Sequence, residues 1–374
     1  MSIETSLSYS NALPRLLDDR LAERISVTDF GAKADSGITD NAPLIQNAWD
    51  ALEDSQALFL PATRGSAYYG IGDTVAFTGK NRMRVYSDGM ARVEMSDKSK
   101  PAFLIGGTDV TVTVDVEGLD VRFKGALSGG DTDAIALKVQ NLAWSKWDRI
   151  NVWNAYDGIR QVSEATANPA GNVVFNNSFG EIYIGQFFGH GVRFQPYQNA
   201  NTQNYFAALF LSGVSAASTT CVSAFDMRAT SHVTVEQMNI EKMTATRGLV
   251  RLAVASNIGR LYFEGAQTTN ISEGWLQNVS GGCNIGQFHI HNTEIARTGL
   301  DNDQKLITEF SADSTVRIGQ MIFTDVTVAA GDMLTLSGTS AGGSQGSKLT
   351  VGDLLDPNGC LSGNGSGFAS ISVG

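Results

Sequence analysis

The most constraining feature of this chain is an imperfect repeat of strand-like segments in its second half. Three segments align without gaps, namely 257–264 (NIGRLYFE), 284–291 (NIGQFHIH) and 317–324 (RIGQMIFT). Segments 235–241 and 179–185 fit the same frame, and the spacings between Val235, Ile258, Ile285 and Ile318 are 23, 27 and 33 residues. A constant strand core with a variable period predicts a solenoid, in which coils bury their inward side chains against one another and insertions fall in the turns.

The composition agrees with many short strands joined by tight turns. Glycine accounts for 40 of the 374 residues, proline for only 7, and charged residues for 17%. This mixture is unlike that of a helical bundle. The length exceeds that of a usual single domain, but an elongated repeat can hold it in one continuous core.

Two short helices are expected before the strands begin. Leu13, Leu17 and Leu21 form one stripe of an amphipathic helix, which would pack on its own domain or serve trimerisation or virion attachment. A strand-like segment at 25–30 follows, and then a second helix from about Asp40 to Asp54, with Asp40 as N-cap and Pro43 in its first turn. Its apolar face (Leu44, Ile45, Ala48, Trp49 and Leu52) is suited to cover one end of the core.

Charge and cysteine usage exclude several classes of partner. The net charge of −11 repels phosphate backbones and anionic lipid, so we expect neither nucleic acid nor membrane insertion. The N-terminal residues lack the basic and apolar regions of a secretory signal, which predicts synthesis in a cytosol without signal-peptide export. Cys221, Cys283 and Cys360 are scattered, and we interpret them as buried apolar residues. No metal and no cofactor are expected.

A resemblance to a known family lies near the N-terminus. Residues 26–41 (SVTDFGAKADSGITDN), followed by Leu44-Ile45-Gln46-Asn47-Ala48, resemble the opening of pectate-lyase-superfamily β-helices. That family's pattern runs roughly V-x-D-F-G-A-x-G-D-G-x-T-D-[DN]. Ala34 stands where the family usually has glycine and Ser36 is an extra residue, which indicates an altered turn. The resemblance implies a right-handed parallel β-helix with short N-terminal helices.

The lead-in to this motif points to bacteriophage proteins. Residues 18–27 (DDRLAERISV) are similar to the segment that precedes the motif in phage tailspikes and capsular depolymerases. Residues 58–62 (LFLPA) also look like the strand that follows it, so the resemblance covers roughly 14–90. It implies a homotrimer on a virion tail, next to tail or baseplate proteins, that meets a bacterial surface polysaccharide. We therefore divide the chain into an attachment or trimerisation segment (1–25), the β-helix (26–334) and Gly/Ser-rich terminal coils or tail (335–374).

Outer-face positions of the aligned strands provide candidate catalytic residues. The inward positions are expected to be Ile258, Leu261, Phe263 and their equivalents. One outer column then contains Glu241, Glu264 and His291 on successive coils about 4.8 Å apart. Two carboxyl groups this close resemble the pair of a retaining glycosidase, about 5 Å apart, in which one is nucleophile and the other acid and base. We predict these three residues as catalytic.

Candidate substrate-binding residues lie in the neighbouring outer columns. They are Arg260, Tyr262, Tyr183, Asn239 and His289. The tyrosines would serve as platforms for sugar rings. In a lyase mechanism His291 or a glutamate would instead be the base, with Arg260 neutralising a uronate. The same column equally fits a solvated polar ladder or a trimer interface.

Other acidic residues compete for a catalytic role. Asp131 and Asp133 belong to a glycine-rich turn that is suited to cation binding, catalysis or the turn alone. Asp148, Asp157 and Glu164 lie close in sequence to Trp144, Trp147 and Trp153, which would form a sugar-binding wall or pack in the core. Three functions stay open: a polysaccharide-degrading tailspike, a receptor-binding or structural tail protein without activity, and a cellular pectin-lyase-like enzyme.

Overall fold

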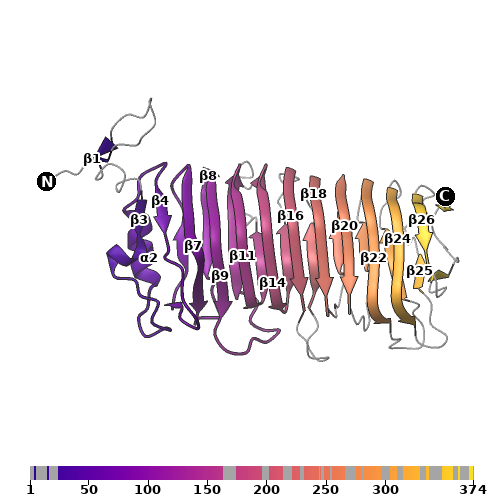
Figure 1. Ribbon diagram of the computed structural model, residues 1–374, viewed down its shortest axis with the longest axis horizontal. Helices are drawn as coiled ribbons and strands as arrows, with labels where there is room; N and C mark the ends of the chain where they lie inside the picture. The colour runs from indigo at the N-terminus through magenta and orange to yellow at the C-terminus, as the bar shows by residue number, and fades with distance from the viewer. Residues whose placement is uncertain are drawn as a thin grey trace.

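The protein is a right-handed parallel β-helix with one short α-helix at its N-terminal end (Figure 1). The computed structural model describes residues 4–5, 15–16, 24–162, 174–195, 202–213, 221–227, 231–243, 245, 248–252, 255–265, 275–278, 282–295, 304–309, 315–328, 334–336, 348–356, 361–362 and 370–373. From β6 onward the chain alternates between two parallel sheets, apart from β13, so each coil adds a strand to both. The solenoid predicted from the repeat is confirmed.

The larger sheet has fourteen strands and carries the aligned repeat. Its members are β3 (Arg24–Ser26), β4 (Ala57–Phe59), β5 (Tyr69–Ile71), β7 (Met83–Met95), β9 (Val114–Phe123), β11 (Lys146–Ala155), β14 (Ser178–Phe187), β16 (Thr202–Ser212), β18 (Ser231–Glu241), β20 (Ser256–Glu264), β22 (Gly282–Ile295), β24 (Thr315–Val328), β26 (Lys348–Leu355) and β28 (Ser370–Val373).

The smaller sheet has twelve strands. They are β6 (Val75–Phe77), β8 (Phe103–Val112), β10 (Ile135–Ala143), β12 (Asp157–Val162), β13 (Val174–Phe175), β15 (His190–Gln195), β17 (Ser223–Met227), β19 (Val250–Leu252), β21 (Leu276–Asn278), β23 (Gln304–Glu309), β25 (Leu334–Leu336) and β27 (Leu361–Ser362). Strands β25 to β28 lie within 335–374 or at its edge and continue both sheets to the C-terminal end of the stack.

The core is a column of apolar side chains between the sheets. Equivalent inward positions hold equivalent residues, so rings stack from coil to coil: the centroids of Phe179 and Phe206 lie 4.4 Å apart, and those of Phe263 and Phe288 lie 5.4 Å apart. All four rings are fully buried. Burial of this kind contributes about 2 kcal/mol per large side chain, which makes neighbouring coils depend on one another for stability.

Four successive strands, β20, β22, β24 and β26, contain a glycine at the same position, where the coils approach closely. Gly259, Gly286, Gly319 and Gly352 occupy one column, and a Cβ atom on Gly286 would lie 2.6 Å from the carbonyl oxygen of Gly259. Gly319 and Gly352 face the glycine of the preceding coil in the same way, at 2.7 and 2.5 Å. The glycine of the sequence repeat is therefore explained by close backbone approach between coils.

The predicted second helix is confirmed as α2 (Ala42–Asp50), which is shorter than expected. Asn41 occupies the N-cap position, while the Asp40 carboxylate accepts hydrogen bonds from the backbone N–H groups of Ala42 and Gly72. Trp49 is buried against Phe77, with ring centroids 4.9 Å apart. The helix lies at the N-terminal end of the stack, where it covers the first coils (Figure 1).

Two expectations for the N-terminal region were wrong. Arg15–Leu16 forms a short strand, β2, that pairs antiparallel with β1 (Glu4–Thr5), so the first helix is not present at these positions. A short isolated amphipathic helix is marginal without a partner, and Leu13, Leu17 and Leu21 lie outside the described residues. The expected strand at 25–30 ends at Ser26, because a capping box with Asp29 starts a 3-10 helix, η1 (Val27–Phe30).

The cysteines behave as apolar side chains where the structure describes them. Cys221 and Cys283 are buried, as predicted, and burial raises the pKa of the Cys221 thiol. Cys360 lies outside the described residues. Among the described residues, no helix combines the length and the apolar character needed to span a membrane.

Candidate functional site

The outer face of the fourteen-stranded sheet follows the predicted frame. Ile258, Leu261 and Phe263 are buried, as expected. Gly259 and Arg260 both lie outside between the first two, so strict alternation is interrupted once, and it resumes after Arg260. This extra outward residue brings Tyr262 and Glu264 onto the same outer face.

The three predicted catalytic residues lie in one column on successive coils. Glu241 on β18 is the register partner of Glu264 on β20, and Glu264 is the partner of His291 on β22. All three side chains are partly exposed. Neighbouring parallel strands lie about 4.8 Å apart, so the register places these three residues next to one another on the outer face.

Tyr262 connects the members of this cluster. Its hydroxyl donates a hydrogen bond to Glu264 Oε2 at 3.2 Å, and the Arg260 guanidinium lies 5.1 Å from its ring centroid. Its ring also meets the imidazoles of His289 and His291, with centroids 5.1 and 6.2 Å away. Burial, and then the nearby Glu264 carboxylate, raise the pKa of the Tyr262 phenol. The hydroxyl therefore remains a hydrogen-bond donor over the physiological pH range.

Thr324 anchors the two histidines on the far side of Tyr262. Its Oγ1 lies 2.7 Å from His289 Nε2 and 3.0 Å from His291 Nδ1. Burial, followed by the positive charge of Arg260, lowers the pKa of His289 below its ordinary value. His289 is therefore neutral near pH 7 and presents one donor and one acceptor nitrogen.

Asn239 completes this cluster, whereas Tyr183 does not belong to it. Asn239 is the register partner of Tyr262 and accepts a hydrogen bond from Gln237 at 3.3 Å. Strand β16 lies between β14 and β18, so Phe210 separates Tyr183 from Asn239 in their column. We call Glu241, Glu264, His291, Arg260, Tyr262, Asn239 and His289 the glutamate cluster.

The alignment of the repeats placed Tyr183 next to Asn239 because it omitted the coil between them. Phe179 and Val235 are 56 residues apart in the sequence, which is close to twice the usual spacing. The strand-like segment Ala207–Gly213 (AALFLSG) was the available signal, because it supplies the coil between them.

Tyr183 instead lines a separate cavity of about 380 Å³ on the same sheet. Arg149, Asn151, Glu181, Tyr183 and Phe210 surround it, on three successive strands from β11 to β16. The ring of Trp153 lies 5.1 Å from that of Tyr183. We call this the arginine hollow. The sequence did not single out Arg149 or Asn151, although they occupy the outer positions of the strand-like segment RINVW.

The competing acidic residues have structural roles where they are described. Asp131 accepts hydrogen bonds from the Ser128 N–H and hydroxyl, at 2.7 and 2.9 Å, which holds the turn that also contains Asp133. Asp148 accepts a hydrogen bond from the backbone N–H of Glu181 at 3.0 Å. Glu164 lies outside the described residues.

The tryptophans do not form one wall. Trp147 is fully buried, and its indole N–H donates to the Val114 carbonyl at 3.2 Å. Trp144 is exposed and meets Phe175 edge to face, with centroids 4.9 Å apart. Trp153, on the outer face beside Tyr183, is the member of the group positioned to meet a ligand.

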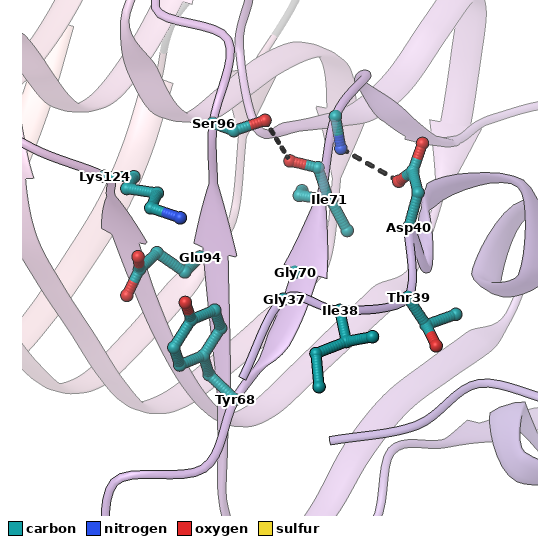
Figure 2. A pocket seen from close by; sticks show the side chains of 11 residues that line it. Gly37, Ile38, Thr39, Asp40, Tyr68, Gly70, Ile71, Glu94, Ser96 and Lys124 are labelled. Carbon is teal, nitrogen blue, oxygen red and sulfur yellow. Dashed lines mark hydrogen bonds between the residues drawn. The ribbon is translucent and has the colours of Figure 1, made fainter. Parts of the chain in front are cut away.

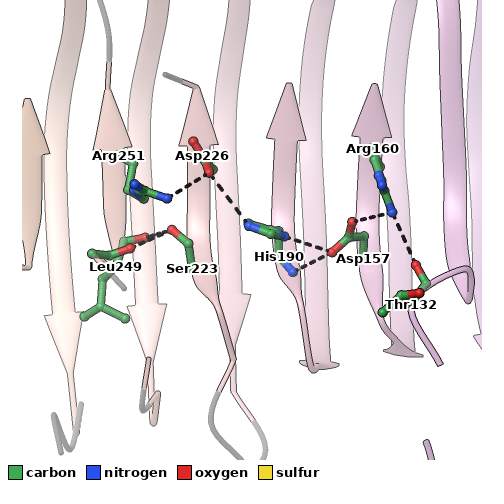
Figure 3. A network of polar contacts seen from close by, with 9 residues as sticks. Thr132, Asp157, Arg160, His190, Ser223, Asp226, Leu249 and Arg251 are labelled. Carbon is green, nitrogen blue, oxygen red and sulfur yellow. Dashed lines mark hydrogen bonds and ion pairs between the residues drawn. The ribbon is translucent and has the colours of Figure 1, made fainter. Parts of the chain in front are cut away.

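Asp157 belongs to a buried polar network on the smaller sheet (Figure 3). Its Oδ1 lies 3.1 Å from His190 Nδ1, and the other imidazole nitrogen lies 3.7 Å from Asp226 Oδ2. Arg251 pairs with the same Asp226 oxygen at 3.4 Å. Ser, His and Asp are the residue types of a catalytic triad, but the Ser223 hydroxyl donates to the backbone carbonyls of Gly248 and Leu249 and not to His190. These side chains are almost fully buried, so the network is structural.

The architecture belongs to the class of right-handed parallel β-helices, and comparisons with known proteins agree with the fold. No family model matches the chain. The tail spike protein of Shigella phage Sf6 is 40% identical over 76 residues, which are 20% of this chain and 12% of that protein.

Solved structures share the fold at low sequence identity. The tailspike of Acinetobacter phage vb_AbaP_AS12 has a TM-score of 0.60 at 13% identity, covering 90% of this chain and 58% of that one. The tailspike of Acinetobacter baumannii phage Fri1, described as a capsular polysaccharide depolymerase, scores 0.51 at 12% identity, covering 93% and 65%. The DFA-IIIase of Arthrobacter chlorophenolicus scores 0.56 at 10% identity, covering 94% and 98%. The chain thus spans less than two thirds of the length of these tailspikes.

Proposed function

We propose that this chain is the β-helix of a bacteriophage tailspike that binds a bacterial surface polysaccharide on its fourteen-stranded sheet and cleaves it at the glutamate cluster. The observation that carries the proposal is the register pairing of Glu241 with Glu264 beside Tyr262 on an exposed sheet face. The match to the Shigella phage tail spike protein supports the phage origin.

The contacts of Tyr262 favour different roles for the two glutamates. Because the Tyr262 hydroxyl donates to Glu264 and orients its carboxylate, we assign Glu264 as nucleophile. Glu241, one coil away, is assigned as acid and base, as in a retaining glycosidase. In this scheme Glu241 protonates the leaving sugar oxygen while Glu264 bonds to the anomeric carbon, and water then releases the sugar with Glu241 as base. A lyase reaction would use His291 or a glutamate as base, with Arg260 opposite a uronate.

The remaining side chains of the cluster are suited to hold sugar. Asn239 and the neutral His289 offer both donors and acceptors for hydroxyl groups. The partly exposed Tyr262 ring provides an apolar surface that fits the face of a pyranose. Such a mixture of a few polar groups around an aromatic ring is typical of ligand sites.

Replacing either glutamate by glutamine tests the proposal. Glu241→Gln and Glu264→Gln retain shape but remove the titratable group, so depolymerisation of host polysaccharide should fall at least about a hundredfold. Tyr262→Phe keeps the ring but removes the hydroxyl that orients Glu264, so it should lower turnover more than substrate binding. Glu236→Gln, which alters an exposed glutamate on the same strand as Glu241, is the control and should retain full activity.

Two outcomes would redirect the assignment. If both glutamine variants digest polysaccharide at wild-type rates, the glutamate cluster is a polar ladder and not a catalytic site. If the wild type binds host cells without digestion, the chain is a receptor-binding tail protein. Hydrogen bonds between outer side chains, such as Gln287 to Gln320 at 2.9 Å, favour the receptor-binding function, because they satisfy the polar groups of neighbouring coils without a ligand.

A cellular sugar-processing enzyme is the third candidate. The similarity to the DFA-IIIase, which was solved in complex with DFA-III, covers nearly all of that protein and supports it. The tail spike match favours the phage assignment over this one, because it rests on sequence identity in addition to fold. Detection of the chain in purified virions by mass spectrometry would separate the two.

The assembly that we propose is a homotrimer attached to phage tail or baseplate proteins. Leu355 on β26 is 53% exposed and is the register partner of Ile322 in an outer column, and burial of such a leucine at a subunit contact would stabilise a trimer. Light scattering of the purified chain at micromolar concentration should give three times the monomer mass. A stable monomer under these conditions would contradict the proposed assembly.

A further inference from the structure

The arginine hollow lies on the outer face of the fourteen-stranded sheet, apart from the glutamate cluster. Two more cavities adjoin it toward the N-terminus, with volumes of about 700 and 260 Å³. The larger is lined by Trp153, whose ring contacts Tyr183 of the hollow. It shares Glu94 and Lys124 with the smaller one, where Tyr68 lies beside Glu94 and Asp40 lies on the opposite side (Figure 2). The three cavities therefore form a row.

Charged side chains of both signs line this row, and its arginines share their carboxylates. Glu117 pairs with two guanidinium groups, those of Arg84 at 2.6 Å and Arg149 at 2.8 Å. These hydrogen bonds hold the pKa of Glu117 below its usual value, so its carboxylate is ionised and its single charge is shared between the two arginines.

A second cluster, in which two arginines again share one carboxylate, lies further along strand β9. Asp120 pairs with Arg92 at 3.3 Å and with Arg122 at 2.8 Å. Lys124 lines two of the cavities and has no ion pair within 4 Å among the residues that the structure describes. A guanidinium group that shares its carboxylate with a second arginine keeps N–H donors that can bind an anionic ligand.

We propose that the arginine hollow binds an acidic sugar residue of the polysaccharide, an inference that rests on the proposed function. Arg149 meets the sugar carboxylate, because its guanidinium lines the cavity while Glu117 occupies only part of its donors. Tyr183 and Phe210 contact the apolar face of the ring, and Asn151 and Glu181 bind hydroxyl groups. The neighbouring cavities hold the adjoining sugars of the same strand.

Two arginine variants form a matched pair for the test. Arg149→Gln and Arg84→Gln each remove one of the two partners of Glu117, so any structural effect of that loss is shared. Arg149 lines the hollow and Arg84 does not. Thermal unfolding followed by circular dichroism checks that both variants fold.

The probe is an array of bacterial surface glycans with acidic and neutral repeat units, followed by calorimetry on each acidic glycan that binds and on its carboxyl-reduced form. The wild type should bind the acidic form about tenfold or more tightly than the reduced form, as a charged hydrogen bond provides. Arg149→Gln should lose this preference and Arg84→Gln should keep it.

The outcomes separate this inference from the proposed function. Binding to neutral glycans alone, equal affinity for acidic and reduced forms, or equal losses in the two variants would overturn the acidic-sugar subsite while leaving a polysaccharide-binding protein. Failure of the wild type to bind any glycan on the array would instead overturn the proposed function itself, and the subsite with it.

Discussion

Replacement of Gly286 by alanine tests the physical basis of the coil stacking. The added Cβ would lie 2.6 Å from the Gly259 carbonyl oxygen, whereas real Cβ atoms essentially never come closer than 3.0 Å. The two coils must therefore separate locally by about 0.4 Å or more, which strains the ladder between β20 and β22. Overpacking of this kind costs about 1–3 kcal/mol.

Gly282 provides the matched control, because it lies on the same strand and a Cβ there meets nothing within 4 Å. Both substitutions reduce the entropy of the unfolded chain by the same amount, about 0.4–1 kcal/mol. The difference between the two variants therefore isolates the clash. Gly282→Ala should be neutral or slightly stabilised, and Gly286→Ala should have a free energy of unfolding about 1–3 kcal/mol lower than Gly282→Ala.

Urea denaturation followed by tryptophan fluorescence measures this difference. Amide hydrogen exchange in β20 and β22 should localise it, since a solenoid depends on contacts between neighbouring coils. Equal stability and equal exchange in the two variants would show that the coils tolerate a side chain at this position, and would refute the explanation of the glycine column.

Further predictions concern single side chains. His289 should titrate below the ordinary pH of about 6.5 in a nuclear magnetic resonance experiment, and Arg260→Gln should raise its midpoint. Because the unfolded chain takes up this proton at higher pH than the folded chain, folding stability should fall as the pH drops below about 6.5, less so in His289→Asn. A titration midpoint of His289 at the ordinary value for histidine would contradict both the lowered pKa and the predicted loss of stability. Asp226→Ala should lower the free energy of unfolding by about 3–5 kcal/mol in denaturation experiments, because it leaves Arg251 buried without this carboxylate. A decrease of less than about 1 kcal/mol would count against the structural role of the network. Chelator treatment should leave the melting temperature unchanged, because no metal is expected to support folding, and a drop of several degrees would show otherwise.

Local pattern was sufficient for the parts of the protein that repeat. Ile258, Leu261 and Phe263 could be assigned to the core because every coil presents the same face inward, and the pairing of Glu241 with Glu264 followed from the same alignment. The second helix was predictable for a similar reason, since its apolar face and the proline in its first turn are encoded within a few residues.

The remaining features depend on contacts between residues far apart in the chain. The position of Tyr183 was misjudged because a register is set by the number of intervening coils, and one coil, β16, was omitted. The arginine hollow could not be predicted, since Arg149, Glu181 and Phe210 come from three coils whose turns differ in length. The role of Asp157 was equally hidden, because its partner His190 comes from the next strand of the smaller sheet, and His190 in turn meets Asp226 on the strand after that.

The sequence by itself determined the solenoid, its inward positions and the composition of its outer columns, because these depend on short-range alternation repeated from coil to coil. Only the tertiary structure decided which outer side chains share a cavity, which charges pair, and which acidic groups are buried. Those properties depend on turn length and on the stacking of distant coils, and the residue pattern of a single strand encodes neither.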